Sequence, residues 1–158
     1  MSGVKIISLG YTVPHYRYAQ EEVFTSLGYP RHFFRIFRDA QIGHRHFVLP
    51  VDRIKTLSFQ EQQEDYIAHA TDLAKRALIE SLDYRDPKEL GFLSYSTCTG
   101  FPPGPTVSHY LALQLCLPPD LQINNLSSLG CEAAFPGLRN CYYYTTVSRK
   151  PSAAIACE

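Results

Sequence analysis

The chain has 158 residues, of which 45% are hydrophobic and 19% charged, and its 15 basic and 15 acidic residues cancel. This composition predicts an ordinary soluble domain with one core, or one half of a larger domain, and the balanced charge excludes a global field that would attract nucleic acid or an anionic membrane. The apolar run in residues 1–14 is too short for a secretory signal, and no stretch approaches the roughly 20 apolar residues that span a bilayer, so we expect a cytoplasmic protein.

The N-terminal part of the chain predicts one buried strand followed by a short helix. Residues 4–14, VKIISLGYTVP, are apolar and β-branched and end in turn residues, which is typical of a buried strand. Residues 18–30 contain helix formers followed by Gly28 and Pro30, a pattern that ends a helix.

Phenylalanine and arginine then alternate over residues 31–43, which predicts an amphipathic helix with a basic face. Residues 44–50, HRHFVLP, predict an extended segment. The longest helix is expected over residues 59–82, with Ser58 as its N-cap and acidic residues in its first turns. Its apolar stripe is rich in alanine, so we expect this helix to lie deep against a sheet or another helix.

The second half of the chain alternates between strands and helices. Strands are expected within residues 90–100, 121–128 and 151–158, and helices within 102–118 and 132–150. This alternation predicts an α/β layered fold with a mainly parallel sheet, in which binding groups gather at the carboxyl ends of the strands.

The five cysteines suggest neither a disulfide framework nor a zinc ribbon, because their number is odd and no CxxC pair is present. Most free cysteines are buried small hydrophobes, and that is the expectation for most of this set. Its members are Cys98, Cys116, Cys131, Cys141 and Cys157.

Cys131 differs from the others because it follows Gly130 in a turn that leads into a predicted helix. At such a helix start, unpaired backbone N–H groups and the helix dipole favour a thiolate. Gly130 permits a sharp turn, and Pro136 in the first helical turn breaks no intrahelical hydrogen bond. The turn therefore suits a nucleophilic cysteine, although simple packing at a strand-to-helix junction is an alternative reading.

The segment GCEAAFPGLR, residues 130–139, resembles the nucleophilic-cysteine motif of the thiolase superfamily. The wider pattern resembles the type III polyketide synthases, which are chalcone-synthase-like enzymes. Matching segments follow in order over essentially the whole chain: SLGYTVPHYRYAQEEV, FRDAQIGHRHFVLP, LSYSTCTGFPPGPTVSHYLALQL, the cysteine motif and AAIACE. The resemblance implies the N-terminal half of a thiolase-like condensing enzyme, spanning residues 1–158.

The resemblance also implies roles for particular residues. Cys131 would accept an acyl group from a coenzyme A thioester and hold it while malonyl-CoA is decarboxylated and condensed onto it. Cys98 and Thr99 would line the pocket for the starter acyl group. Pro103 matches a position at which plant relatives send a side chain across the dimer interface, and here it would wall the cavity differently.

Arg35 matches a position that contacts coenzyme A, where a guanidinium can pair with phosphate. Asp39 replaces a lysine found in some plant relatives, which weakens the expected phosphate contact and leaves coenzyme A or a carrier protein as alternative acyl carriers. The condensation that the resemblance implies needs no metal or redox cofactor. His44 and His46 lack a third metal ligand and suit a surface or interface position. Glu132 would oppose a thiolate if its carboxylate pointed inward, and would favour the helix start if it pointed outward.

Relatives complete the site with a histidine and an asparagine from a second half, and none of the six histidines here lies in such a segment. We therefore expect the chain alone to be inactive and a C-terminal half to lie on another chain or to be missing, with complete units forming a dimer. The alternatives are a ketoacyl synthase III-like enzyme that uses an acyl carrier protein, and a non-catalytic thiolase-fold partner subunit.

Overall fold

A computed structural model describes residues 3–99, 104–127 and 129–158. The chain forms two compact units, Met1–Thr12 with Ile67–Glu158, and Val13–Tyr66. The long helix α4, Phe59–Leu82, contributes residues to both units.

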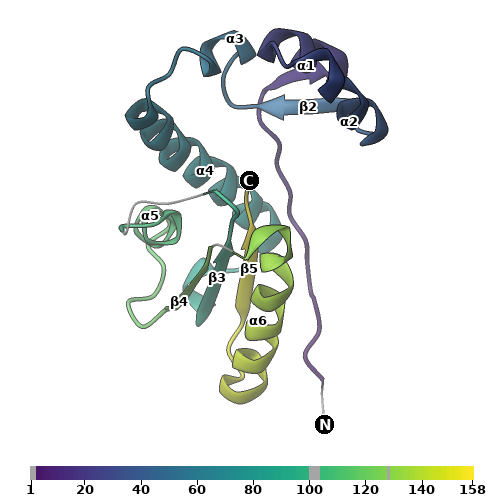
Figure 1. Ribbon diagram of the computed structural model, residues 1–158. Helices are drawn as coiled ribbons and strands as arrows, with labels where there is room; N and C mark the ends of the chain where they lie inside the picture. The colour runs from purple at the N-terminus through teal and green to yellow at the C-terminus, as the bar shows by residue number, and fades with distance from the viewer. Residues whose placement is uncertain (1–2, 100–103, 128) are drawn as a thin grey trace. The chain divides into compact units, whose positions relative to one another are not determined.

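The larger unit is built on a parallel sheet of three strands in the order β4–β3–β5 (Figure 1). In the central strand, Ser96 pairs with Leu126 on one side and with Ala156 on the other. The expected parallel α/β sheet is therefore confirmed. The strands are β3, Phe92–Ser96; β4, Gln122–Leu126; and β5, Ser152–Ala156.

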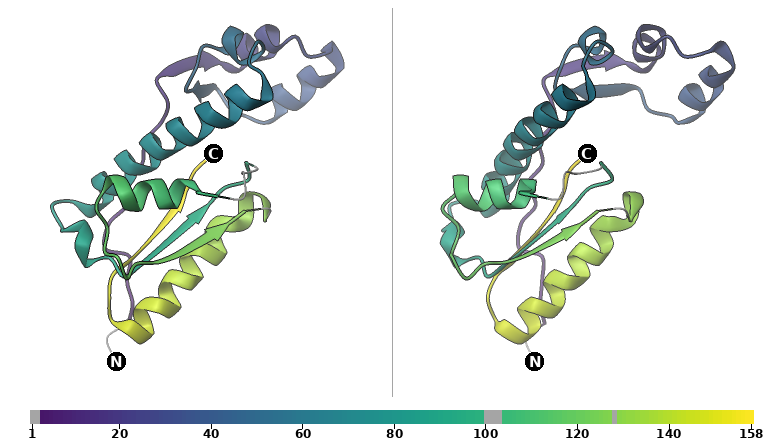
Figure 2. Two further views of the ribbon diagram at one scale, coloured as in Figure 1. Left: turned by 90° about the vertical axis from the view of Figure 1, so that its left-hand side faces the viewer. Right: turned by 60° about the vertical axis from the view of Figure 1, so that its left-hand side comes forward.

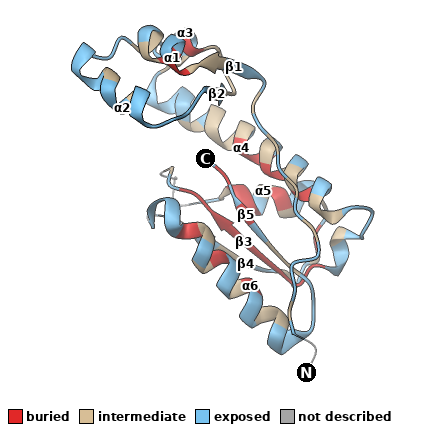
Figure 3. Ribbon diagram, turned by 90° about the vertical axis from the view of Figure 1, so that its right-hand side faces the viewer, coloured by how far each residue is buried: buried red, intermediate tan, exposed pale blue. Residues whose placement is uncertain are grey.

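Helices cover both faces of this sheet, with α6 on one face and α5 on the other (Figure 2). All five residues of β3 are buried, as the red strand in Figure 3 shows, and Leu93 and Tyr95 are almost fully enclosed. Gly137 of α6 lies close to β3, because an added Cβ would meet Ser94 Oγ at 3.1 Å. The helical elements are α5, Val107–Gln114; α6, Ala134–Ser148; and the 3-10 turns η2, Pro87–Glu89, and η3, Gly130–Ala133.

Helix α4 has the bounds expected from the sequence and the expected cap. Ser58 Oγ accepts a hydrogen bond from Glu61 N at 3.3 Å, and the Glu61 carboxylate accepts one from Ser58 N at 2.8 Å. This reciprocal pair satisfies two backbone donors at the helix start. Ala70 and Ala74 are buried, so the prediction of a deeply packed helix is confirmed for this stretch.

The smaller unit is an antiparallel pair of strands with three short helices. Helix α1 ends at Gly28, whose φ of 68° is the left-handed conformation that favours glycine. The single helix expected over residues 31–43 is shorter than predicted, because it divides into a 3-10 turn and a six-residue α-helix. The elements are β1, Tyr16–Ala19; α1, Gln20–Leu27; η1, Arg31–Phe33; α2, Phe34–Asp39; β2, His44–Phe47; and α3, Val51–Ile54.

The expected buried strand over residues 4–14 is wrong. No regular secondary structure forms there, and the side chains of Ile6 and Leu9 are 78% and 82% exposed. A cavity of about 490 Å³ separates residues 4–10 from β5, and no hydrogen bond joins the two within the described residues. A β-strand is held by hydrogen bonds to a neighbouring strand. Residues 4–10 have no such neighbour among the described residues, so they do not form a strand despite their apolar, β-branched sequence.

Residues 10–12 nevertheless attach this segment to α4. A Cβ added to Gly10 would lie 2.6 Å from Ser81 N, so only glycine permits this close approach. Tyr11 N donates a hydrogen bond to the Glu80 carboxylate at 3.0 Å. The segment is therefore fixed at one end while its apolar side chains stay in solvent.

Among the described helices, none has the length and apolar character needed to cross a membrane.

Candidate active site

The candidate site lies at the carboxyl ends of β3 and β4, as the predicted parallel sheet requires. The ladder continues one residue past β3, since Thr97 N donates a hydrogen bond to Leu126 O at 3.1 Å. Cys98 follows directly, and Cys131 lies in the turn η3 after β4. Residues 33 positions apart in sequence thus emerge at one edge of the sheet.

Cys131 occupies a 3-10 turn that continues into α6. Gly130 begins the turn with φ of 64°, and an added Cβ would meet nothing within 4 Å, so its backbone conformation rather than space favours glycine. Pro136 lies in the first turn of α6, as predicted. The Cys131 and Glu132 side chains are both exposed, which leaves the sulfur accessible and the carboxylate free to extend into solvent.

Cys131 contacts Cys98, which in turn lies beside Thr99 and Glu158 in this unit. The Sγ atoms of Cys98 and Cys131 are 3.9 Å apart. The Glu158 carboxylate accepts a short hydrogen bond from Cys98 N and one from Thr99 Oγ1 at 3.5 Å. The structure thus brings Cys98, Thr99 and Cys131 together and adds Glu158.

Glu158 was missed in the sequence analysis because its contacts are about 60 residues away along the chain. One signal was available: it follows β5, the third parallel strand, so it leaves the sheet at the same edge as the two cysteines.

The surroundings of Cys98 disfavour its thiolate. Desolvation first, and then the Glu158 carboxylate and Cys131, raise the pKa of Cys98 to about 11. Both nearby groups destabilise a second negative charge. Near neutral pH, Cys98 is therefore a protonated thiol that can donate a weak hydrogen bond.

A second polar cluster fixes the start of α5 against β4. Thr106 Oγ1 lies 2.8 Å from His109 Nδ1, and the buried Ser108 donates a hydrogen bond to Asn125 Oδ1 at 2.7 Å. These contacts satisfy the helix start and hold it against β4, which is a positioning role. Pro103, the third predicted pocket residue, lies outside the described residues.

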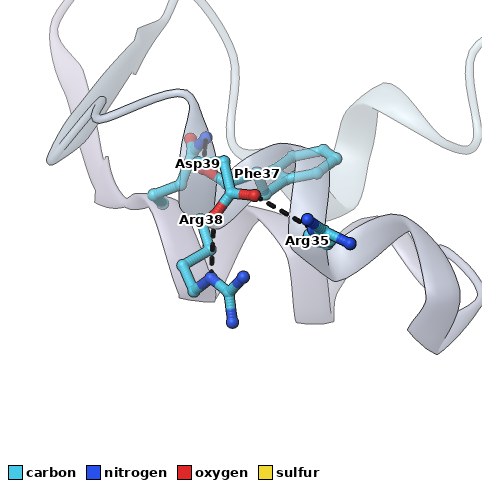
Figure 4. A network of polar contacts seen from close by, with 5 residues as sticks. Arg35, Phe37, Arg38 and Asp39 are labelled. Carbon is cyan, nitrogen blue, oxygen red and sulfur yellow. Dashed lines mark hydrogen bonds and ion pairs between the residues drawn. The ribbon is translucent and has the colours of Figure 1, made fainter.

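Arg35 belongs to the smaller unit, where it is engaged by Asp39 (Figure 4). Arg35 Nε lies 3.3 Å from Asp39 Oδ2, and Arg38 Nε lies 2.9 Å from Asp39 Oδ1. The hydrogen bond from Arg38 lowers the pKa of Asp39, so the carboxyl stays charged over a wider pH range. The Arg35 side chain is 82% exposed and can still meet an anion, with part of its charge balanced by Asp39.

The histidines considered as metal ligands remain at the surface. His44 and His46 are exposed, and His46 Nδ1 lies 3.0 Å from Pro14 O. Across residues 3–99, 104–127 and 129–158, no group of three or more histidine, cysteine, aspartate or glutamate side chains is arranged to hold a metal ion.

Comparison with known proteins shows which fold this chain shares with solved structures. The sequence matches no family model, and no curated protein matches it. Solved structures do match. CsyB complexed with CoA-SH superposes with a TM-score of 0.83 at 19% identity, over 97% of this chain and 46% of that one. The fold is that of the type III polyketide synthases.

Two further solved structures agree with this assignment of the fold. The fungal type III polyketide synthase ORAS matches 99% of this chain with a TM-score of 0.80 at 18% identity. The tetrahydroxynaphthalene synthase of Streptomyces coelicolor A3(2) matches 96% of it with a TM-score of 0.81 at 20% identity. This chain covers 47% of each, so it spans about half the length of these type III enzymes. The expected thiolase-like α/β fold is confirmed.

Proposed function

We propose that this chain is the cysteine-bearing half of a type III polyketide synthase and that Cys131 is the acyl acceptor. The observation that carries the proposal is the position of Cys131. It is an exposed thiol in a glycine-led turn at the carboxyl edge of a parallel sheet, in a chain with the type III fold. An accessible sulfur at a helix start is the arrangement that covalent acyl transfer requires.

The first step is transfer of the starter acyl group. The Cys131 thiolate attacks the carbonyl carbon of an acyl-CoA starter, a new thioester bond forms, and the coenzyme A thiolate leaves. Coenzyme A is thus a leaving group carried by the substrate. The solved complex of CsyB with CoA-SH supports this choice of carrier over a carrier protein.

The second step extends the acyl group by two carbons. Malonyl-CoA loses carbon dioxide, and the electron pair of the broken bond forms an enolate. The enolate carbon attacks the Cys131 thioester, and the cysteine thiolate leaves. The product is a β-ketoacyl-CoA, and the electrons balance without a redox cofactor. Repetition of the cycle would lengthen the chain further.

Cys98 and Thr99 are proposed to line the acyl pocket. Cys98 Sγ is 3.9 Å from Cys131 Sγ, so a group bound to Cys131 would lie against it. The raised pKa of Cys98 keeps its thiol uncharged near neutral pH, so an apolar acyl chain would meet a neutral sulfur and not a second thiolate. Arg35 is proposed to contact the phosphates of coenzyme A through its exposed guanidinium.

We further propose that a C-terminal half completes the enzyme and that complete units dimerise. The free edge of β5 and residues 4–10 face each other across the cavity of about 490 Å³, and both carry unpaired backbone groups in the described part of the chain. An added strand would pair with both walls and bury Ile6 and Leu9. By the family resemblance, the same half would bring the histidine and asparagine that stabilise the oxyanion.

The proposal is tested by native mass spectrometry of the purified protein, followed by a condensation assay on the assembled material with acyl-CoA and malonyl-CoA. We expect a second polypeptide in stoichiometric amount and a β-ketoacyl product. Cys131→Ala should abolish the product, whereas Cys116→Ala, at another exposed thiol, should leave it unchanged. Undiminished condensation by Cys131→Ala would show that this cysteine is not the nucleophile.

A further inference from the structure

The two cysteines at the sheet edge differ from the remaining cysteines because both are exposed and their thiols are in contact. Cys98 and Cys131 are both exposed, with Sγ atoms 3.9 Å apart. Cys141 and Cys157 are buried, and the exposed Cys116 follows α5, where its Sγ contacts Leu113 O at 3.9 Å. One pair of accessible thiols is therefore in contact within the described chain.

The backbone brings this pair together in a way that permits a covalent link. Cys98 lies two residues after β3, and Cys131 lies in η3, five residues after the adjacent parallel strand β4. A disulfide needs its sulfurs about 2 Å apart, so the two Sγ atoms, which are 3.9 Å apart, must approach by roughly 2 Å. Side-chain rotation covers such a distance.

We propose that Cys98 and Cys131 form a reversible disulfide when a peroxide reaches the site. One thiol is oxidised to a sulfenic acid as hydrogen peroxide is reduced to water. The second thiol then displaces the sulfenic hydroxyl as a second water, and the S–S bond forms. In sum, two thiols and one peroxide give one disulfide and two waters, and a dithiol reductant reverses the change.

A disulfide would make the Cys131 sulfur unavailable for acylation and so stop condensation. This consequence rests on the proposed function of Cys131. It would also protect Cys131, because a sulfenic acid trapped as a disulfide does not proceed to the irreversible sulfinic acid. The pKa of about 11 at Cys98 limits the closure rate, because thiol exchange proceeds through the thiolate.

The charged and titratable groups that face Cys98 are Glu158, which follows β5, and Cys131 of η3. Replacing Glu158 by glutamine removes a negative charge beside the thiol while keeping an oxygen that accepts hydrogen bonds. This change should lower the pKa of Cys98 and accelerate closure by several-fold.

The test treats the purified protein with graded hydrogen peroxide, blocks free thiols by alkylation, and maps peptides by mass spectrometry. We expect a peptide pair joined through Cys98 and Cys131, a mass lower by about 2 Da for the two lost hydrogens, and reversal by dithiothreitol. Cys98→Ser should abolish the link and send Cys131 to sulfinic acid, whereas Cys116→Ser should retain the link. Faster closure in Glu158→Gln would support control by the Cys98 thiolate, and slower closure would contradict it.

The proposal is overturned if Cys131 becomes a sulfinic acid at equal rates in the unaltered protein and in Cys98→Ser, or if peroxide produces only links that involve Cys116. Circular dichroism of each variant separates loss of the link from loss of the fold. Because the readout is a mass and needs no catalysis, a linked but catalytically inactive protein would contradict the proposed function alone. A condensing enzyme without the link would contradict this inference alone.

Discussion

Two apolar segments of similar sequence character adopt different structures in this molecule. Residues 92–96 and residues 4–10 both have the apolar character of a buried strand, yet the first forms the buried centre of the sheet and the second remains unpaired with exposed isoleucines. The difference is in their neighbours. β3 has β4 on one side and β5 on the other, whereas residues 4–10 face a cavity. Apolar sequence favours a strand, but a partner decides whether it forms.

Truncating one leucine in each segment tests this comparison, and the largest loss of stability is expected in β3. Leu93 is fully buried in β3, so Leu93→Ala should leave a cavity and lower the free energy of unfolding by about 2–5 kcal/mol. Leu9 is 82% exposed, and Leu9→Ala should change the free energy by less than about 0.5 kcal/mol. Urea unfolding of the two variants measures both values, and similar losses would show that residues 4–10 are packed like β3.

A smaller loss is expected where the N-terminal segment attaches to α4. Gly10→Ala places a Cβ against the backbone of Ala77 and Ser81, and the forced shift should lower the free energy of unfolding by about 1–3 kcal/mol. The matched control is Gly3→Ala, because an added Cβ there meets nothing within 4 Å. Hydrogen exchange should show faster exchange at Tyr11 N in Gly10→Ala. Unchanged exchange would mean that the close approach does not hold the segment.

The smallest effect on folding is expected for Ile6→Asp, which also tests the proposal that an added strand fills the cavity beside β5. Ile6 is 78% exposed and lines the cavity beside β5, so its replacement should leave the free energy of unfolding nearly unchanged. It should, however, prevent assembly with the proposed second half, because a charge would be buried against an added strand.

Val147→Asp is the control for this prediction, since Val147 is 86% exposed on α6 and does not line the cavity. Native mass spectrometry compares the two variants. Assembly that survives Ile6→Asp as well as Val147→Asp would contradict the proposal that this cavity receives a strand.

Local signals in the sequence account for the parts of the fold that were predicted correctly. The start of α4 follows from Ser58 and Glu61, which are three residues apart and cap each other. The turn at Cys131 follows from Gly130, whose positive φ is a local property. The parallel sheet followed from alternation of strands and helices along the chain.

Contacts between distant parts of the chain account for what was missed. The strand predicted over residues 4–14 does not form because no described strand pairs with it, and no local pattern in the sequence indicates whether such a partner is present. The contact of Glu158 with Cys98 joins residues 60 positions apart, and it depends on the lengths of three strands ending at one edge.

The interaction of Asp39 with both Arg35 and Arg38 is a local contact that their spacing already implies, because Arg35 and Asp39 are four residues apart on a helix.

Acylation of Cys131 is the most direct measurement of the central claim. The assembled protein is incubated with a short-chain acyl-CoA, quenched in acid, and mapped by mass spectrometry. We predict one acyl thioester on the peptide that contains Cys131, with release of an equal amount of coenzyme A, retained in Cys116→Ala and lost in Cys131→Ala. Coenzyme A release that is unaffected by Cys131→Ala, or no acyl group on Cys131, would contradict the account.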